Sequence, residues 1–123
     1  MIGEFAGLLK DLLAAIVDGV GSSVSGWDQK SYESVVNCLL LKDEIAVKEA
    51  VDHLILEGKA LAIPPIYLAS QRHTSLTVRR YCQQSLGRLD SSDRINKTIQ
   101  GKDIHGALDA LIGEYGHFKD DYH

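Results

Sequence analysis

Hydrophobic residues along the chain recur every three or four positions, which is the spacing of one face of an α-helix. The first such stripe predicts a helix over residues 5–20, and its members are Phe5, Leu8, Leu9, Leu12, Leu13, Ile16, Val17 and Val20. Gly19 and Gly21 favour the end of this helix, because glycine readily adopts the left-handed conformation that closes a helix. Serines and Gly26 then continue a polar loop.

Two more stripes follow this loop. Asp28 is placed to cap a helix whose buried side is Tyr32, Val35, Val36 and Leu39. Asp43 and Glu44 open the next helix, because acidic residues stabilise a helix N-terminus. Its apolar stripe runs through Ala46, Val47, Ala50, Val51, Leu54 and Ile55. Gly58 is expected to end it.

The second half of the chain predicts shorter helices. Proline is tolerated in the first turn of a helix and not in its interior, so Pro64 and Pro65 indicate a helix over 64–71, with a turn near Leu61 before it. A further helix is expected over 75–89. Residues 90–92 are expected to cap a short helix after it, and the last helix begins at Asp103. No segment alternates with the period of a strand. We predict a single all-α domain over residues 1–123 with about seven helices.

The apolar positions also repeat over a longer distance. Val47, Val51 and Leu54 recur 31 residues later as Val78, Cys82 and Ser85, and the same shift carries Tyr32 to Ile63 and Val35 to Ile66. The last helix repeats the pattern at Ile104, Leu108, Leu111 and Ile112, and Ile104 lies 26 residues after Val78. Helix pairs that recur at such an interval are typical of a stacked α-solenoid.

Residues 63–89, IPPIYLASQRHTSLTVRRYCQQSLGRL, resemble one unit of the HEAT-repeat family. Val78-Arg79 and Leu86-Gly87 match that family's Val-Arg and Leu-Gly, and Cys82 and Ser85 stand where it has alanine. The acidic residue of the family's turn is absent and His73 lies near its place, so this turn is expected to be held differently. The resemblance is weaker over residues 31–58, and it is weakest over the last two predicted helices, which follow residue 90. It implies a short right-handed stack of antiparallel helix pairs, with a buried set of Val47, Val51, Leu54, Val78, Leu86, Leu108 and Leu111.

Composition and charge narrow the function classes. Hydrophobic residues make up 45% of the chain and charged residues 24%, which is typical of a globular domain and excludes disorder. The net formal charge is −5 over residues 1–60, +4 over 61–100 and −3 over 101–123. Because a nucleic-acid binder carries a basic excess or stripe, nucleic acid is not the expected partner. The central arginines are expected to lie on solvated helix faces.

No residue pattern points to catalysis, a cofactor or a metal. Gly21 and Gly26 have P-loop spacing, but Trp27 replaces the lysine that would hold phosphate. The five histidines lack metal-site spacing. Cys82 lies on an apolar stripe and Cys38 at the edge of another, which favours structural thiols over a Cys/His nucleophile. We therefore assign no catalytic, cofactor or metal residues, and no small-molecule partner.

The expected location is cytoplasmic. No apolar run approaches the roughly 20 residues of a membrane span, and Glu4, Lys10 and Asp11 interrupt the first apolar segment as a secretory signal would not. Two cysteines are too few for a disulfide scaffold, so both are expected to be reduced.

The acidic ends and the repeat pattern together favour a protein-binding module with a basic partner. The predicted contacts are Glu49, Asp52, Asp109, Glu114, Asp120, Asp121 and Tyr122. The aromatic residues near the C-terminus have a second interpretation, in which Tyr115 and Phe118 complete the core instead of contacting a partner.

The chain is similar in size and charge to bacterial immunity proteins, which implies neutralisation of a basic toxin such as a nuclease. One alternative is an adaptor or chaperone resembling the HEAT-like proteins of phycobilisome lyase systems. An alternative from another class is an enzyme that uses Cys82 and a histidine.

Overall fold

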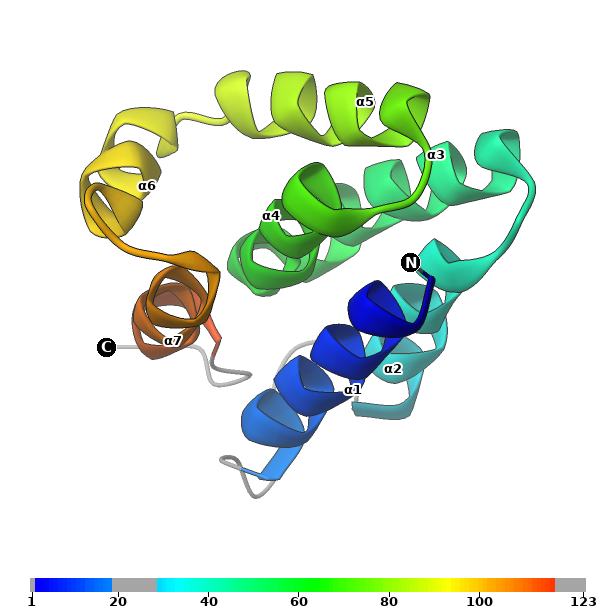
Figure 1. Cartoon of the computed structure of the whole chain (residues 1–123), viewed down its shortest axis with the longest axis horizontal. Helices are drawn as coiled ribbons and strands as arrows, with labels where there is room; N and C mark the ends of the chain where they lie inside the picture. The colour runs from blue at the N-terminus through cyan, green and yellow to red at the C-terminus, as the bar shows by residue number, and fades with distance from the viewer. Residues whose placement is uncertain (1, 19–28, 117–123) are drawn as a thin grey trace.

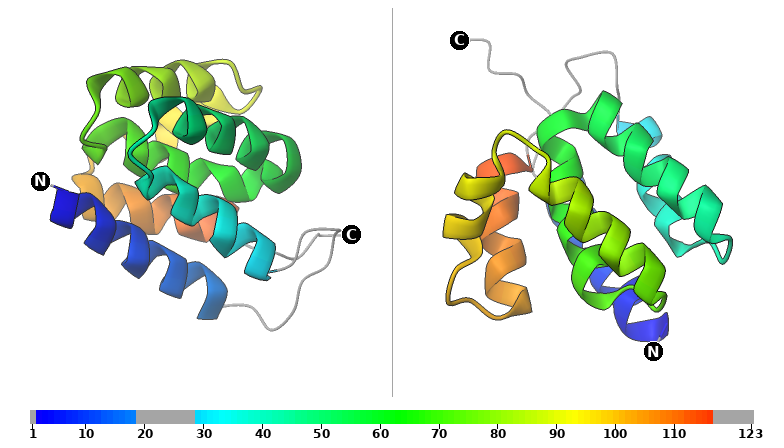
Figure 2. Two further views of the ribbon diagram at one scale, coloured as in Figure 1. Left: turned by 90° about the vertical axis from the view of Figure 1, so that its right-hand side faces the viewer. Right: turned by 90° about the horizontal axis from the view of Figure 1, so that it is seen from above.

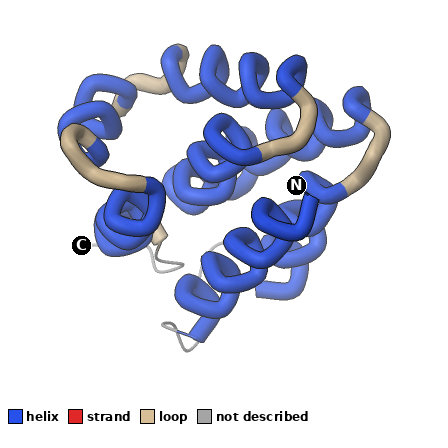
Figure 3. Tube along the Cα trace, in the orientation of Figure 1, coloured by secondary structure: helices blue, strands red, loops and turns tan. Residues whose placement is uncertain are grey.

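The computed structural model of the protein describes the structure of residues 2–18 and 29–116. Within these ranges the chain is helical and contains no strand, which confirms the predicted all-α class (Figure 3). The helices are α1 (Ile2–Asp18), α2 (Gln29–Asn37), α3 (Glu44–His53), α4 (Ile63–Arg72), α5 (Leu76–Gly87), α6 (Ser92–Ile99) and α7 (Ile104–Tyr115) (Figure 1). None of the described helices is long and apolar enough to cross a membrane.

Helix α4 lies at the centre of the fold. It packs against α1, α5 and α7 (Figure 2), and every residue from Ile63 to Ser70 is buried. A helix that is apolar all round must be surrounded, and the sequence IPPIYLAS has almost no polar side. Pro64 and Pro65 occupy its first turn, where the missing amide donors cost little, as predicted.

The outer helices bury one stripe each against this centre. On α1 the buried residues are Phe5, Leu9, Leu12 and Ile16, which are members of the predicted stripe. Tyr32 of α2 is fully buried, and its hydroxyl donates to the Leu61 carbonyl at 3.0 Å. This bond ties α2 to the short 3₁₀ segment Lys59–Ala62, through which the chain enters α4.

The 31-residue spacing in the sequence recurs in the burial pattern. Val47 and Val78 are both fully buried, and so are Val51 and Cys82. Ser75 also donates a 2.6 Å hydrogen bond to the Glu44 carboxylate, which joins the first turns of α5 and α3 across the same interval. The 31-residue spacing therefore relates residues of α3 and α5 that share the same burial.

The α4–α5 turn is held by His73. Its ring is buried beside Phe5, with 5.2 Å between ring centroids. Nδ1 accepts from the Ser75 backbone N–H at 2.9 Å, so Nε2 carries the proton and donates to the Leu39 carbonyl at 3.1 Å. A neutral histidine thus satisfies the turn amide and joins it to the 3₁₀ segment Cys38–Leu40.

Three local expectations are corrected. Leu86 is only half-buried, because it lines a shallow hollow beside the short helix α6 together with Ile95 and Ile99. Ser91 stands at the N-cap of α6 without a side-chain capping bond. The chain turns after Gly58 as predicted, but Lys59 is the residue with positive φ, at 50°. The expected Asp28 cap and the Gly19 and Gly21 helix end lie outside the described residues.

Candidate functional site

The solvent-facing side of α3 and of the π-helical turn after it, Leu54–Gly58, carries an unusual stripe. Ile45 and Leu56 are large apolar residues that are 68% and 69% exposed. Between them on the same face lie Glu49 and Asp52, both exposed. We call these four residues the α3 stripe.

The position of α3 at the edge of the fold explains why the α3 stripe faces solvent. Its opposite side packs against α5 and the segment Cys38–Leu40, with Val47, Ala50, Val51 and Leu54 buried. The Asp43 carboxylate accepts from the Ile45 backbone N–H at 3.0 Å and so fixes the first turn. The α3 stripe is therefore presented by a regular, capped helix.

One carboxylate of the stripe is held in place. The Tyr81 hydroxyl of α5 donates to Asp52 Oδ1 at 2.6 Å, and Lys48 Nζ lies 5.5 Å from the centroid of the Tyr81 ring. The hydrogen bond to Asp52 is the main reason that the pKa of Tyr81 is raised, with burial adding to it. This bond fixes the orientation of the Asp52 carboxylate.

The predicted acidic contacts do not form one surface. Glu49 and Asp52 lie on α3, whereas Asp109 and Glu114 lie on α7, on the other side of α4 (Figures 1 and 2). Asp109 is exposed, and Glu114 is ion-paired with Arg94 of α6. Tyr115 packs against the core, and the predicted contacts Asp120, Asp121 and Tyr122 lie outside the described residues, as does Phe118.

Helix α5 carries central arginines on its solvated face, as the sequence predicts. Its outer side carries the exposed residues Arg80, Gln83, Gln84 and Arg88, so a basic helix lies next to acidic α3. The acidic face is therefore restricted to α3 in this half of the molecule.

The two thiols differ in burial. Cys82 is fully buried, and burial raises its pKa to about 12, so the thiolate is suppressed near neutral pH. Cys38 is half-buried and its Sγ donates to the Ser34 carbonyl at 3.4 Å. Over residues 2–18 and 29–116, no three histidine, cysteine or acidic side chains gather in a way that could hold a metal ion.

Two residues of the α3 stripe escaped the sequence analysis. Ile45 and Leu56 fall outside the apolar stripe that predicted the buried side of this helix. That phase difference is itself a signal, because on a helix with one buried side an apolar residue out of register with that side faces solvent. Comparison of the chain with protein families, with curated proteins and with solved structures finds no match.

Proposed function

We propose that the protein is a non-catalytic binding module that captures a basic protein through the α3 stripe. The observation that carries this proposal is the pairing of two highly exposed apolar side chains, Ile45 and Leu56, with the carboxylates of Glu49 and Asp52 between them. Exposed apolar surface rimmed by polar residues marks interaction sites, and here two apolar side chains share one helix face with the carboxylates between them.

The spacing of the stripe suits a partner helix or ridge. Ile45 and Leu56 are eleven residues apart, which is about 16 Å along a helix at 1.5 Å per residue. Apolar anchors supply most of the binding free energy, and charges beside them raise the association rate and select the partner's sign. Asp52 adds little ordering cost on binding, because Tyr81 already holds it.

Within this class we favour an inhibitor of a basic toxin such as a nuclease, similar to bacterial immunity proteins. The scaffold would be a short HEAT-like stack of the pairs α2–α3, α4–α5 and α6–α7, preceded by α1. A cytoplasmic location agrees with thiols at Cys38 and Cys82 that remain reduced. An adaptor that cradles a client protein would use the same stripe without inhibiting its client.

The test begins with affinity capture from the source cells by the wild-type protein, followed by a binding titration with the purified captured protein. A basic partner is expected. Ile45→Ala and Leu56→Ala should weaken binding by about tenfold or more if these side chains are anchors. Glu49→Lys should mainly slow association and reduce its dependence on salt.

Glu57→Lys is the matched control, because it makes the same charge change one position beyond Leu56 and off the stripe. It should alter association less than Glu49→Lys does. An acidic partner would overturn the proposal, and so would binding that depends on Arg79, Arg80 and Arg88 while the α3 stripe variants bind normally. Inhibition of the purified partner's activity separates the toxin inhibitor from the adaptor.

A further inference from the structure

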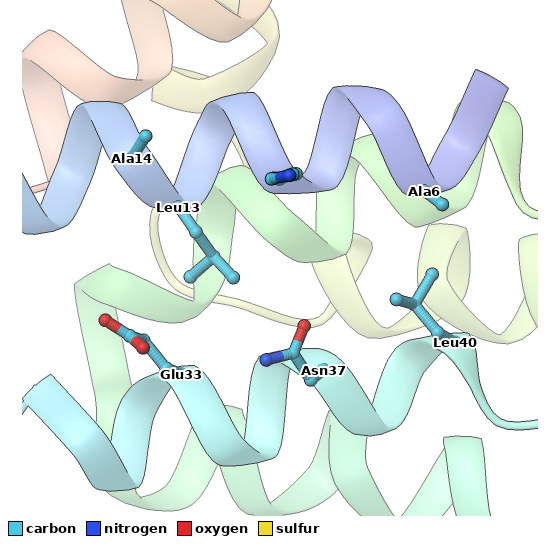
Figure 4. A pocket seen from close by; sticks show the side chains of 7 residues that line it. Ala6, Leu13, Ala14, Glu33, Asn37 and Leu40 are labelled. Carbon is cyan, nitrogen blue, oxygen red and sulfur yellow. The ribbon is translucent and has the colours of Figure 1, made fainter. Parts of the chain in front are cut away.

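Two hollows at the surface differ in the charge of their lining. The open groove between α1 and α2, of about 530 Å³, takes Lys10 from one helix and Glu33 from the other (Figure 4), so its charge selects no ligand of one sign. The hollow between α3 and α5 has about 260 Å³, and its charged lining residues are Lys48 and Arg80. This second lining is therefore positive, although acidic α3 forms one side of it.

Lys48 is separated from the acidic partners that its own helix offers. Glu44 and Asp52 lie four residues before and after it, at the spacing where opposite charges on a helix pair. Glu44 instead accepts a 2.6 Å hydrogen bond from Ser75, at the start of α5. Asp52 accepts one from Tyr81. Lys48 Nζ lies 5.5 Å from the centroid of the Tyr81 ring and forms no ion pair within the described ranges, so its charge is left for an anion from another molecule.

The environment of Arg80 on α5 is similar. The sequence of this helix, LTVRRYCQQSLG, contains no acidic residue. Arg80 is exposed, and it forms no ion pair with any residue that the structure describes. The lining also includes the Thr77 hydroxyl and the Gln84 carboxamide, which can donate hydrogen bonds. Two cations and two neutral donors thus line one hollow, and a carboxylate is the group that complements them.

We propose that this hollow receives an Asp or Glu side chain of the basic protein that the α3 stripe captures. The inference rests on the proposed function, because Tyr81 lines the hollow and also holds Asp52 of the stripe. A partner that contacts Asp52 therefore lies directly beside the hollow. Leu76, which is 52% exposed, also lines it and offers an apolar contact to the stem of the entering side chain.

A carboxylate of a seated protein suits the hollow better than a free anion does. In the open hollow water screens both cations, and exposed ion pairs of this kind contribute little. A partner that covers the hollow excludes water, and the lower dielectric constant strengthens the pair. Charge pairs across an interface also fix its register, so this contact would select among basic proteins for one with a carboxylate at the right place.

The test is a binding titration of the full chain and its variants with the purified captured partner. Lys48→Gln and Arg80→Gln should each weaken binding by about tenfold or more, because each takes a cation from the covered carboxylate. A partner with only basic groups here would bind these variants more tightly, since they remove repulsion. Lys48→Arg keeps the charge and should bind nearly as the wild type does. Arg88→Gln, two turns beyond Arg80 and outside the lining, is the matched control and should not weaken binding.

A charge exchange identifies the carboxylate. Each Asp and Glu of the partner is replaced by Lys in turn and titrated against the wild type and the double variant Lys48→Glu/Arg80→Glu. One replacement should weaken binding to the wild type and recover about tenfold or more of the affinity that the double variant loses. Thermal unfolding of the variants should stay close to that of the wild type, because Arg80 is exposed and Lys48 is only half-buried.

The outcomes separate this inference from the proposed function. If Ile45→Ala and Leu56→Ala weaken binding while Lys48→Gln and Arg80→Gln bind as tightly as the wild type or more tightly, the inference is overturned and the proposed function stands. If the two stripe variants bind normally, or no basic protein is captured, both fail.

Inorganic phosphate tests the other source of an anion. Saturable sub-millimolar binding of phosphate to the protein alone at constant ionic strength, lost in Arg80→Gln, would assign the hollow to a free anion and overturn the proposal. We expect no such saturation.

Discussion

Helices α3 and α4 have the same length, ten residues each, and opposite environments. Eight consecutive residues of α4 are buried, whereas α3 buries Val47, Ala50 and Val51. The difference follows from position, because α4 is enclosed by α1, α5 and α7, while α3 is packed on one side only, against α2, α5 and the segment Cys38–Leu40. Apolar residues on α4 therefore stabilise the fold, and the exposed Ile45 and Leu56 beside α3 are free for another use.

The largest expected contrast between the two helices is in the cost of losing an apolar side chain. Leu68 of α4 is fully buried, so Leu68→Ala should lower the free energy of unfolding by about 2 to 5 kcal/mol through lost burial and a residual cavity. Chemical denaturation of both proteins measures this. A loss below about 1 kcal/mol would show that α4 is not the rigid centre of the fold.

The next effect concerns the link between α2 and the entrance to α4. Tyr32→Phe removes the buried hydrogen bond to the Leu61 carbonyl and leaves that acceptor without its donor. We expect a loss of about 1 to 2 kcal/mol in denaturant unfolding. Tyr81→Phe is the comparison, because its hydrogen bond to Asp52 is exposed and its loss should cost less.

The contrast between α3 and α4 also shows what the sequence can predict. The helical stripes located the described helices within a few residues, because burial on one face requires apolar residues at helical spacing. The 31-residue repeat identified equivalent buried positions such as Val51 and Cys82. Leu86 was misjudged because helical phase shows which side of α5 turns inward, but not how completely the neighbouring α6 covers that side.

The candidate site was predictable only in part. Glu49 and Asp52 were identified from charge and helical phase, and both lie on the α3 stripe. The sequence grouped them with Asp109 and Glu114, since helical phase does not reveal which helices share a side of the molecule. The contact from Tyr81 to Asp52 links residues 29 positions apart, and only the tertiary packing of α3 on α5 creates it.

The α4–α5 turn should make stability depend on pH. Burial is the main cause that lowers the pKa of His73; nearby Arg79 lowers it further, while the Leu39 hydrogen bond and Glu44 act in the opposite direction. The unfolded chain then binds a proton more readily than the folded protein does, so stability is full above about pH 6.5 and falls below it. The slope reaches at most about 1.4 kcal/mol per pH unit. Denaturation at pH 7.5 to 5 should show a smaller slope for His73→Asn, and equal slopes would contradict this role.

A smaller effect of opposite sign is expected where α3 passes into α4. Lys59 has φ of 50° and ψ of −116°, a conformation that side chains disfavour and glycine tolerates. Lys59→Gly should raise the free energy of unfolding by up to about 1 kcal/mol, because relief of strain exceeds the added entropy of the unfolded chain. Gly101→Ala is the converse control, since φ is 76° there and a Cβ meets no neighbour, so only backbone strain should destabilise it.

The smallest effect on stability is expected at the α3 stripe itself. In the double variant Ile45→Ser/Leu56→Ser, both side chains are already mostly in solvent, so the free energy of unfolding should change by less than about 0.5 kcal/mol per site. Serine lowers helix propensity slightly, which accounts for the residual loss. Thermal and denaturant unfolding of the monomer measure it. A cost comparable to that of Leu68→Ala would mean that Ile45 and Leu56 support the fold, and the contrast between a helix that holds the core and a helix that presents a binding surface would then fail.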